Sequence, residues 1–308
     1  MLRQYSPALF MLSSTLSLSI SGLLSKYLAE QITAEWLGFI RFFLPAIVLF
    51  FVLSMSKVKR PSKEMLIPLL TRSACIFVCQ MCFIYALTHL SLVESVVLFG
   101  TGPLFIPVLE KLIFSTPMRR VSIFSLLLTF AGVLLLSGSM TSFSFRPALL
   151  VGLAAGIFNA GSQLSLYRAT KGEMSPVEIN AWTFTLAALW FLPTLTLSPM
   201  FASVSAVPVD GHGVWLLVLC FAVLSGLIIN TQVFRAKAYK LAESGSQLAP
   251  LIFTNLLFTS LWQVLFFNVR FDGFQLGGLA LIVFANVVNV FTPLVWRKLR
   301  PQQLLSQA

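Results

Sequence analysis

Apolar stretches of about twenty residues, each long enough to cross a bilayer core of about 30 Å as a helix, alternate with short polar gaps along the whole chain. Lipid offers the backbone no hydrogen-bond partners, so each spanning segment must satisfy its own peptide groups, as a helix does. The gaps contain helix breakers, among them Pro61, Pro208 and Asp272-Gly273. The pattern predicts ten membrane helices, over residues 7–28, 33–54, 66–88, 91–112, 119–138, 147–168, 175–198, 214–235, 245–267 and 274–296.

The first predicted helix contains the serine-rich segment SSTLSLSISGLLSK. Its alternation of serine and apolar residues resembles a strand, but a lone strand would leave its backbone groups unpaired in lipid. In a helix, four of the hydroxyls share one face: Ser14, Ser17, Ser21 and Ser25. Such a polar face predicts either the lining of a central cavity or close contact with a neighbouring helix.

The composition of the chain excludes an ordinary soluble protein. Hydrophobic residues make up 57% of the chain and charged residues 10%, whereas soluble domains carry about 25% charged residues. The net charge of +11 is spread over short groups rather than one face or arm, so we predict no nucleic-acid partner. Cys75, Cys79 and Cys82 share one helical face, but neither histidine lies near them. We therefore predict buried thiols and neither a metal site nor a cofactor.

Basic residues are distributed unevenly between the two kinds of gap. Three fall on one side of the spans, at Lys26, Arg146 and Arg270. Sixteen fall on the other side, at Arg3, Lys57, Lys59, Arg60, Lys63, Lys111, Arg119, Arg120, Arg168, Lys171, Arg235, Lys237, Lys240, Arg297, Lys298 and Arg300. Cytoplasmic loops carry the excess of Lys and Arg, so both termini are predicted to be cytoplasmic. Arg72, near the cytoplasmic end of its span, is expected to snorkel to that surface, and Glu110 is expected at the interface.

Polar positions recur between the two halves of the chain. A shift of 142 residues places Asn159 on Ser17, and a shift of 152 places Gln232 on Gln80. Five helices are an odd number, so two such halves have opposite orientations in the membrane.

This recurrence predicts an all-α membrane protein whose ten transmembrane helices form two inverted five-helix repeats. The repeats are expected to cover residues 1–143 and 144–308. In proteins built this way, the substrate site lies near the membrane midplane, between the repeats.

Three apolar segments carry further residue patterns. ITAEWLGFIRFFLPAIVLFF contains the pair Arg41-Phe42, YALTHLSLVESVVLFGTGPLF contains Tyr85 and Pro103, and AYKLAESGSQLAPLIFTN is their counterpart in the second half. These segments resemble the second helix and the hairpin of helices three and four in EamA-type members of the drug/metabolite transporter superfamily. The resemblance covers the whole chain. It implies ten helices in two inverted repeats and, most commonly, export of amino acids or related metabolites.

Polar and aromatic side chains at membrane depth are the candidates for a binding site. The candidates for substrate binding are Ser17, Ser21, Arg41, Gln80, Asn159, Gln163, Trp182, Gln232 and Asn255. Asn159 and Gln163 carry longer polar groups than close helix packing requires, which favours a cavity lining. Ser14, Gly152 and Gly156 are instead expected to pack helices together.

Arg41 is a charge inside a predicted span, where charges are costly and mark function or a paired partner. It can hold a substrate carboxylate or phosphate through bidentate hydrogen bonds. It can equally pair with Glu94, near the outer end of the fourth predicted helix, as a gate. The sequence leaves both alternatives open.

Together these patterns predict a secondary transporter of the inner membrane, a monomer or homodimer, that moves a small polar or zwitterionic metabolite across the bilayer by alternating access. Export is what the resemblance implies; uptake or exchange of a nucleoside-like metabolite and lipid flipping are the alternatives. The spans show no cluster of nucleophile, base and metal ligands, so no enzyme is predicted. They also show no acidic residue at mid-membrane depth, so facilitated diffusion or exchange is the simpler mechanism.

Overall fold

The computed structural model describes residues 2–29, 31–55, 60–89, 98–115, 147–197, 211–243 and 251–267, residue 248, and short pieces within 123–135 and 273–288. All regular secondary structure in these residues is helical. The helices are α1 (Leu2–Ala29), α2 (Ala34–Ser54), α3 (Lys63–His89), α5 (Gly102–Phe114), α7 (Pro147–Thr170), α8 (Pro176–Leu197), α9 (Gly211–Leu241) and α11 (Thr254–Phe267).

Five helices of the described residues are long and apolar enough to cross a membrane. Their spanning windows are Pro7–Ser25, Glu35–Ser54, Lys63–Phe83, Pro147–Thr170 and Trp215–Leu241. The predicted helices 119–138 and 274–296 fall mostly outside the described residues. A helical, multi-pass membrane protein is therefore confirmed, while the count of ten helices stays a prediction.

Local sequence determines where α8 begins. The backbone N–H of Glu178 donates to Ser175 Oγ at 3.2 Å, and the backbone N–H of Ser175 donates to Glu178 Oε2 at 2.8 Å. This reciprocal pair is a capping box, which satisfies two N–H groups that a helix start leaves free. Pro176 occupies the first helical position, where its missing N–H costs nothing.

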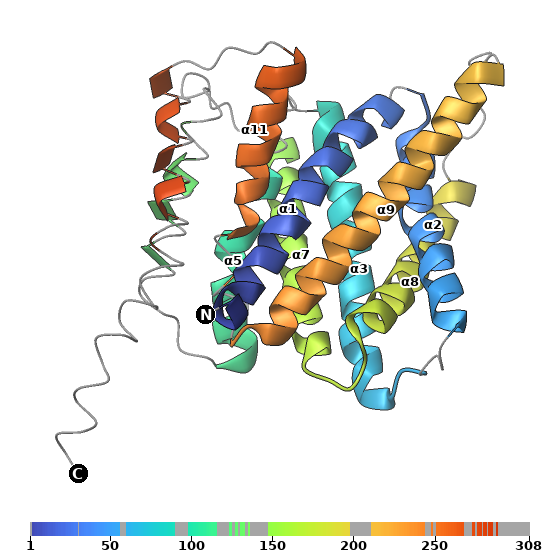
Figure 1. Ribbon diagram of the computed structural model, residues 1–308, viewed down its shortest axis with the longest axis horizontal. Coiled ribbons are helices and arrows are strands. Elements are labelled where there is room, and N and C mark those ends of the chain that lie inside the picture. Colours follow the sequence, from blue (N-terminus) through green and yellow to red (C-terminus); the bar gives the residue numbers. More distant parts are fainter. Residues whose placement is uncertain are drawn as a thin grey trace.

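Both α5 and α11 begin after an interruption inside the bundle. A turn at Thr101 precedes α5, and a turn at Phe253 precedes α11, positions that the shift of 152 residues relates. The hydroxyl of Thr101 donates to the carbonyl of Leu98 at 2.6 Å, and that of Thr254 donates to the carbonyl of Leu251 at 2.7 Å. The two helices start near the middle of the bundle and run towards opposite ends (Figure 1).

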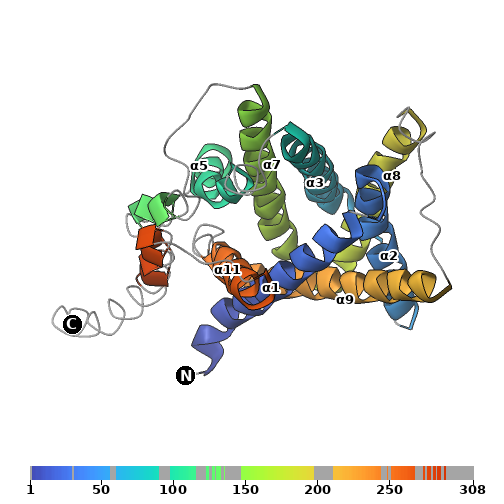
Figure 2. The ribbon, with the colours of Figure 1, turned by 90° about the horizontal axis from the view of Figure 1, so that it is seen from above.

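The long helices form two facing walls. Helix α3 packs along α7, and α1 packs along α9. Seen from above, the α3–α7 pair faces the α1–α9 pair, and α2 packed against α8 joins them along one side (Figure 2). Helix α5 packs on α7, and α11 packs on α1. The interior between the walls is therefore reached by side chains from both halves of the chain.

Aromatic rings pack α2, α3 and α8 together along the side where the two walls are joined. Phe42 of α2 lies against Phe184 and Phe191 of α8, with ring centroids 6.1 Å and 5.7 Å apart. Phe191 also meets Phe77 of α3 edge-on at 5.0 Å. Aromatic pairs in these geometries add to the free energy gained by burial. They fix α2, α3 and α8 as one rigid side of the interior.

The serine face of α1 is buried within the bundle. All four serines predicted to share a face are buried. Ser14 Oγ donates to the carbonyl of Thr231 on α9 at 2.7 Å, whereas Ser21 Oγ and Ser25 Oγ donate to carbonyls of α1 itself, at 2.8 Å and 2.6 Å. The hydroxyls therefore tie α1 to α9 at Ser14 and are satisfied within α1 at Ser21 and Ser25.

Glycines on α7 allow a close approach of the segment before α5. A Cβ on Gly156 would lie 2.6 Å from Thr101 Oγ1 and 2.8 Å from the carbonyl oxygen of Leu98. A Cβ on Gly152 would lie 2.7 Å from Leu98 Cδ1. The predicted packing role of both glycines is confirmed.

Candidate functional site

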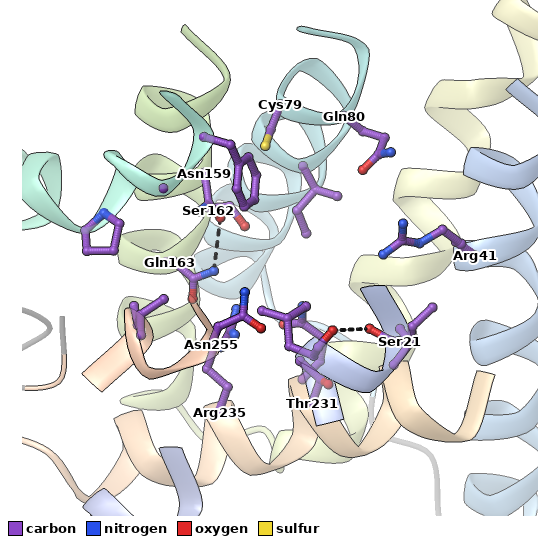
Figure 3. A pocket seen from close by; sticks show the side chains of 18 of the residues that line it. Ser21, Arg41, Cys79, Gln80, Asn159, Ser162, Gln163, Thr231, Arg235 and Asn255 are labelled. Atoms are coloured by element: carbon purple, nitrogen blue, oxygen red, sulfur yellow. Dashed lines mark hydrogen bonds between the residues drawn. The ribbon is translucent and has the colours of Figure 1, made fainter. Parts of the chain in front are cut away.

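A polar cavity of about 160 Å³ lies inside the bundle. Its walls come from α1, α2, α3, α7, α8, α9 and the two interrupted segments around Thr101 and Phe253. Its polar lining consists of Ser21, Arg41, Cys79, Gln80, Asn159, Ser162, Gln163, Thr231, Gln232, Arg235 and Asn255 (Figure 3). Apolar walls are contributed by side chains such as Phe42, Phe184 and Phe253.

The structure brings most of the candidate residues together. Seven of the nine predicted binding residues line this cavity: Ser21, Arg41, Gln80, Asn159, Gln163, Gln232 and Asn255. Arg41 reaches into it from α2 and faces the α7 amides of Asn159 and Gln163 across the space (Figure 3). Their convergence is a structural finding, and their contact with a substrate stays a prediction.

Ser17 and Trp182 lie outside the cavity lining. Ser17 Oγ accepts a hydrogen bond from Asn230 Nδ2 at 2.6 Å, which ties α1 to α9. The ring of Trp182 meets Phe50 edge-on at 5.4 Å and packs against the apolar core. Glu94, the predicted gating partner of Arg41, lies outside the described residues.

The expected position of Arg72 is wrong. Instead of snorkelling to a surface, its side chain is 1% exposed. Its Nη2 donates to Asn180 Oδ1 at 2.9 Å and to Gln232 Oε1 at 3.1 Å, and its Nη1 donates to Thr183 Oγ1 at 3.3 Å. The guanidinium therefore joins α3 to α8 and α9 through its two terminal nitrogens, while its Nε has no partner in the described residues. Glu110, expected at the interface, is also buried, at 3% exposure.

Arg235 is a cavity residue that the sequence did not single out. Counting it among the basic residues of one membrane side assumed that its helix ends there, but α9 continues to Leu241. Its side chain is 3% exposed and lines the cavity. Within the described part of the chain, its Nε and Nη2 have no hydrogen-bond partner. The longer apolar run that begins near Trp215 was the signal that could have placed it inside the membrane.

Several amides of the lining keep free hydrogen-bonding capacity. Gln163 Nε2 donates to Asn159 Oδ1 at 3.3 Å, while Gln163 Oε1 and Asn255 Oδ1 have no partner among the described residues. Gln232 Oε1 accepts from Arg72, which leaves the amide nitrogen as the donor available to a ligand. Buried polar atoms without partners are costly, so their presence around one cavity indicates a place for a polar ligand or water.

A bundle of apolar helices around an internal cavity with polar side chains in its lining defines a helical, multi-pass membrane protein. The profile of the EamA-like transporter family matches residues 6–138 and again 146–291. The chain therefore belongs to the EamA-like transporter family, whose members are transporters and not enzymes.

Similar proteins carry transporter names. The chain is 26% identical to the pseudopaline exporter CntI of Pseudomonas aeruginosa strain UCBPP-PA14 over 206 residues, which cover 67% of this chain and 68% of that protein. It is 29% identical to a riboflavin transporter of Brucella anthropi over 174 residues, or 53% of this chain and 55% of that protein. A solved crystal structure shares its fold with a TM-score of 0.69 at 19% identity, covering 91% of this chain and 99% of the other.

Proposed function

We propose that the protein is a secondary transporter of the inner membrane that moves a small polar or zwitterionic metabolite by alternating access. The observation that carries the proposal is the internal cavity, lined by polar and apolar side chains, that helices of both halves of the chain build together. Inverted-repeat carriers place their substrate sites between the repeats. The names of the relatives, one an exporter and one a transporter, support a metabolite as cargo and export as its direction.

The proposed repeats, 1–143 and 144–308, are supported by the helix contacts. The pair α1–α9 has its counterpart in α7–α3, and α1–α11 has its counterpart in α7–α5. The pair α2–α8 is its own counterpart. These are the pairs expected if each half occupies an equivalent place about a two-fold axis in the membrane plane.

One departure from this symmetry supports alternating access. Helix α9 contacts α7 and α8, whereas in the described residues α3 makes no comparable contacts with α1 and α2. The α7–α9 contact includes the end where α7 and α9 finish, which we assign to the cytoplasm together with both termini. We infer that this conformation is closed on the cytoplasmic side, and that transport exchanges these contacts for their counterparts.

A metabolite screen on the purified protein tests the function. Compounds that raise the midpoint of thermal unfolding are then followed into proteoliposomes that contain the protein. We expect at least one such compound to cross the bilayer with the wild-type protein, and Arg41→Ala to reduce its transport at least tenfold while still inserting into the membrane. Arg168→Ala, at an exposed position of α7, is the matched control.

Two outcomes would contradict this proposal. Wild-type kinetics in Arg41→Ala would remove Arg41 from the transport path. Scrambling of labelled phospholipid without solute uptake would assign lipid flipping instead. Facilitated diffusion or exchange is the proposed mode, since the part of the cavity lining that the structure describes contains no carboxylate to carry a proton. Transport that stops when the proton gradient is collapsed, with binding unchanged, would overturn that mode.

A further inference from the structure

The charge of the cavity lining is unbalanced. Two of its side chains are guanidinium groups, Arg41 of α2 and Arg235 of α9, and among the described residues no Asp or Glu belongs to the lining. In the close-up they approach the same space from different sides, with Arg235 beside Asn255 (Figure 3). An unpaired charge in a low-dielectric interior is strongly unfavourable, so buried charges are normally paired.

The two buried arginines near this cavity differ in how they are satisfied. Both terminal nitrogens of Arg72 donate to neutral side chains of α8 and α9, and only its Nε has no partner in the described residues. Arg235 is equally removed from bulk solvent, at 3% exposure, yet its Nε and Nη2 have no partner in the described residues. Nε and a terminal nitrogen form the fork that binds both oxygens of a carboxylate or phosphate.

The backbone adds positive potential at the same place. Helices α5 and α11 both begin at the cavity: Gly100 and Pro103 line it beside the start of α5, and Phe253 and Asn255 line it beside the start of α11. The first N–H groups of a helix carry the positive end of its dipole and attract anions. Two such helix starts reinforce the guanidinium groups instead of offsetting them.

The remaining walls indicate the body that carries the charge. Phe42, Phe99, Phe184 and Phe253 line the cavity together with aliphatic side chains. Such walls suit an apolar or planar group. An inorganic ion alone would leave this apolar surface in contact with water.

We propose that the cavity binds an organic oxyanion, a carboxylate or phosphate on an apolar body, and that Arg235 is the residue that holds the charged group. Arg41 supplies the second positive charge, and the unpartnered amides of Asn255 and Gln163 bind polar groups on the body. This proposal rests on the proposed transport function and narrows its cargo to an anion.

Matched pairs of neutral and anionic probes test the proposal on the full-length protein in detergent. Benzoate is compared with benzamide, and phenyl phosphate with inorganic phosphate, at equal ionic strength set with sodium chloride. We expect benzoate, phenyl phosphate or both to raise the midpoint of thermal unfolding, while benzamide and chloride leave it unchanged. The benzoate and phenyl phosphate arms distinguish a carboxylate from a phosphate cargo. Equal stabilisation by benzamide, or none by either organic anion, overturns the proposal without any variant.

Variants at Arg235 locate the charged group. Arg235→Gln should weaken the apparent affinity for the stabilising anion at least tenfold, whereas Arg168→Gln, on an exposed part of α7, should leave it unchanged. Arg235→Lys keeps the positive charge but cannot bind both oxygens of the anion as a fork. Its apparent affinity for the anion should therefore lie between those of Arg235→Gln and Arg168→Gln. The unfolding midpoint of the empty Arg235→Gln protein should equal or exceed that of the wild type, because the substitution removes an unbalanced buried charge. Unchanged anion affinity in Arg235→Gln overturns the role of Arg235.

Different outcomes would contradict the anion proposal and the proposed transport function. If proteoliposomes carry a neutral metabolite at the same rate with wild type and Arg235→Gln, the protein is a transporter and the anion proposal is wrong. If the anions bind through Arg235 but neither they nor any compound from the metabolite screen crosses the bilayer, the site stands and the transport function is wrong.

Discussion

The two buried arginines of this bundle differ in their hydrogen-bond partners. Arg72 donates to acceptors on two other helices and acts as a cross-link. Arg235 has donors without partners at the wall of a cavity. Both are buried to a similar degree, so burial alone does not distinguish a structural charge from one that is free to bind a ligand.

The cross-link predicts a specific loss of stability. Asn180→Leu removes the 2.9 Å acceptor of Arg72 and should lower the free energy of unfolding by about 1.5–3 kcal/mol, the range for hydrogen bonds to charged groups. Asn230→Leu, which removes the neutral bond to Ser17, should cost about 1 kcal/mol. Unfolding by denaturant in detergent micelles measures both.

Repeating Asn180→Leu in an Arg72→Met variant tests whether its cost comes from the charge of Arg72. With Arg72→Met already present, Asn180→Leu no longer strands a buried cation, so its cost should fall. If Asn180→Leu lowers the free energy of unfolding equally in both backgrounds, the hydrogen bond to Arg72 is not the cause and the cross-link has no energetic role.

At the scale of single elements, most helix positions could be predicted from the sequence. The start of α2 was predicted at residue 33 and found at Ala34, and the end of α8 was predicted at 198 and found at Leu197. Apolar length defines such ends, because the hydrocarbon core has a fixed thickness. The ends of α9 could not be read this way, since the helix runs on to Leu241. One face of its last turns is buried in the bundle, at Arg235 and Tyr239, while Lys237 and Lys240 are exposed.

The interruptions before α5 and α11 were not predicted. Residues 91–112 and 245–267 read as unbroken apolar helices, yet turns occur at Thr101 and Phe253. A turn inside an apolar run requires partners for the backbone groups that it frees. Here the hydroxyls of Thr101 and Thr254 donate to backbone carbonyls, and both turns lie beside the cavity. Sequence periodicity does not carry that information.

The close contact between α7 and the start of α5 predicts the effect of one methyl group. Gly156→Ala places a Cβ within 2.8 Å of a backbone oxygen that cannot rotate away, so overpacking should cost about 1–3 kcal/mol and reduce transport. Gly226→Ala is the matched control, because nothing lies within 4 Å of its Cβ. The control should be neutral or stabilising, by up to about 1 kcal/mol, since alanine favours a helix over glycine. Thermal unfolding and proteoliposome uptake compare the two; equal effects would show that this contact is loose.

At the scale of the whole molecule, one end of the bundle is fastened by a small cluster. The Tyr167 hydroxyl donates to the carbonyl of Glu243 at 2.6 Å, and Lys171 Nζ donates to the carbonyl of Ala242 at 2.6 Å and to that of Lys240 at 3.2 Å. The Lys171 ammonium also lies 5.0 Å from the centre of the Tyr167 ring. These bonds join the end of α7 to the carbonyl of Lys240, which the end of α9 leaves free, and to the carbonyls of the two residues that follow α9.

In the alternating-access mechanism that we propose, these bonds break when this end opens. Combining Tyr167→Phe with Lys171→Met should shift the population towards a conformation open at this end, by the free energy of the lost bonds. Spin labels at Arg168 and Lys240, both exposed, should then report longer distances. Lys237→Met, which removes only a cation near the rings of Phe10 and Phe234, is the control. An unchanged distance distribution in the double variant would mean that other contacts keep this end closed.

The sequence by itself determined the class of the protein and the residues that meet at its centre. Lipid requires long apolar helices, and polar groups within them are too costly to be placed without partners, so seven of nine candidates converge on one cavity. Only the tertiary structure decided what each polar group does there. Arg72 finds acceptors 108 and 160 positions away in the chain, and the Nε and Nη2 of Arg235 find none among the described residues. Hydrogen bonding depends on neighbours brought from distant helices, and that proximity exists only in the folded bundle.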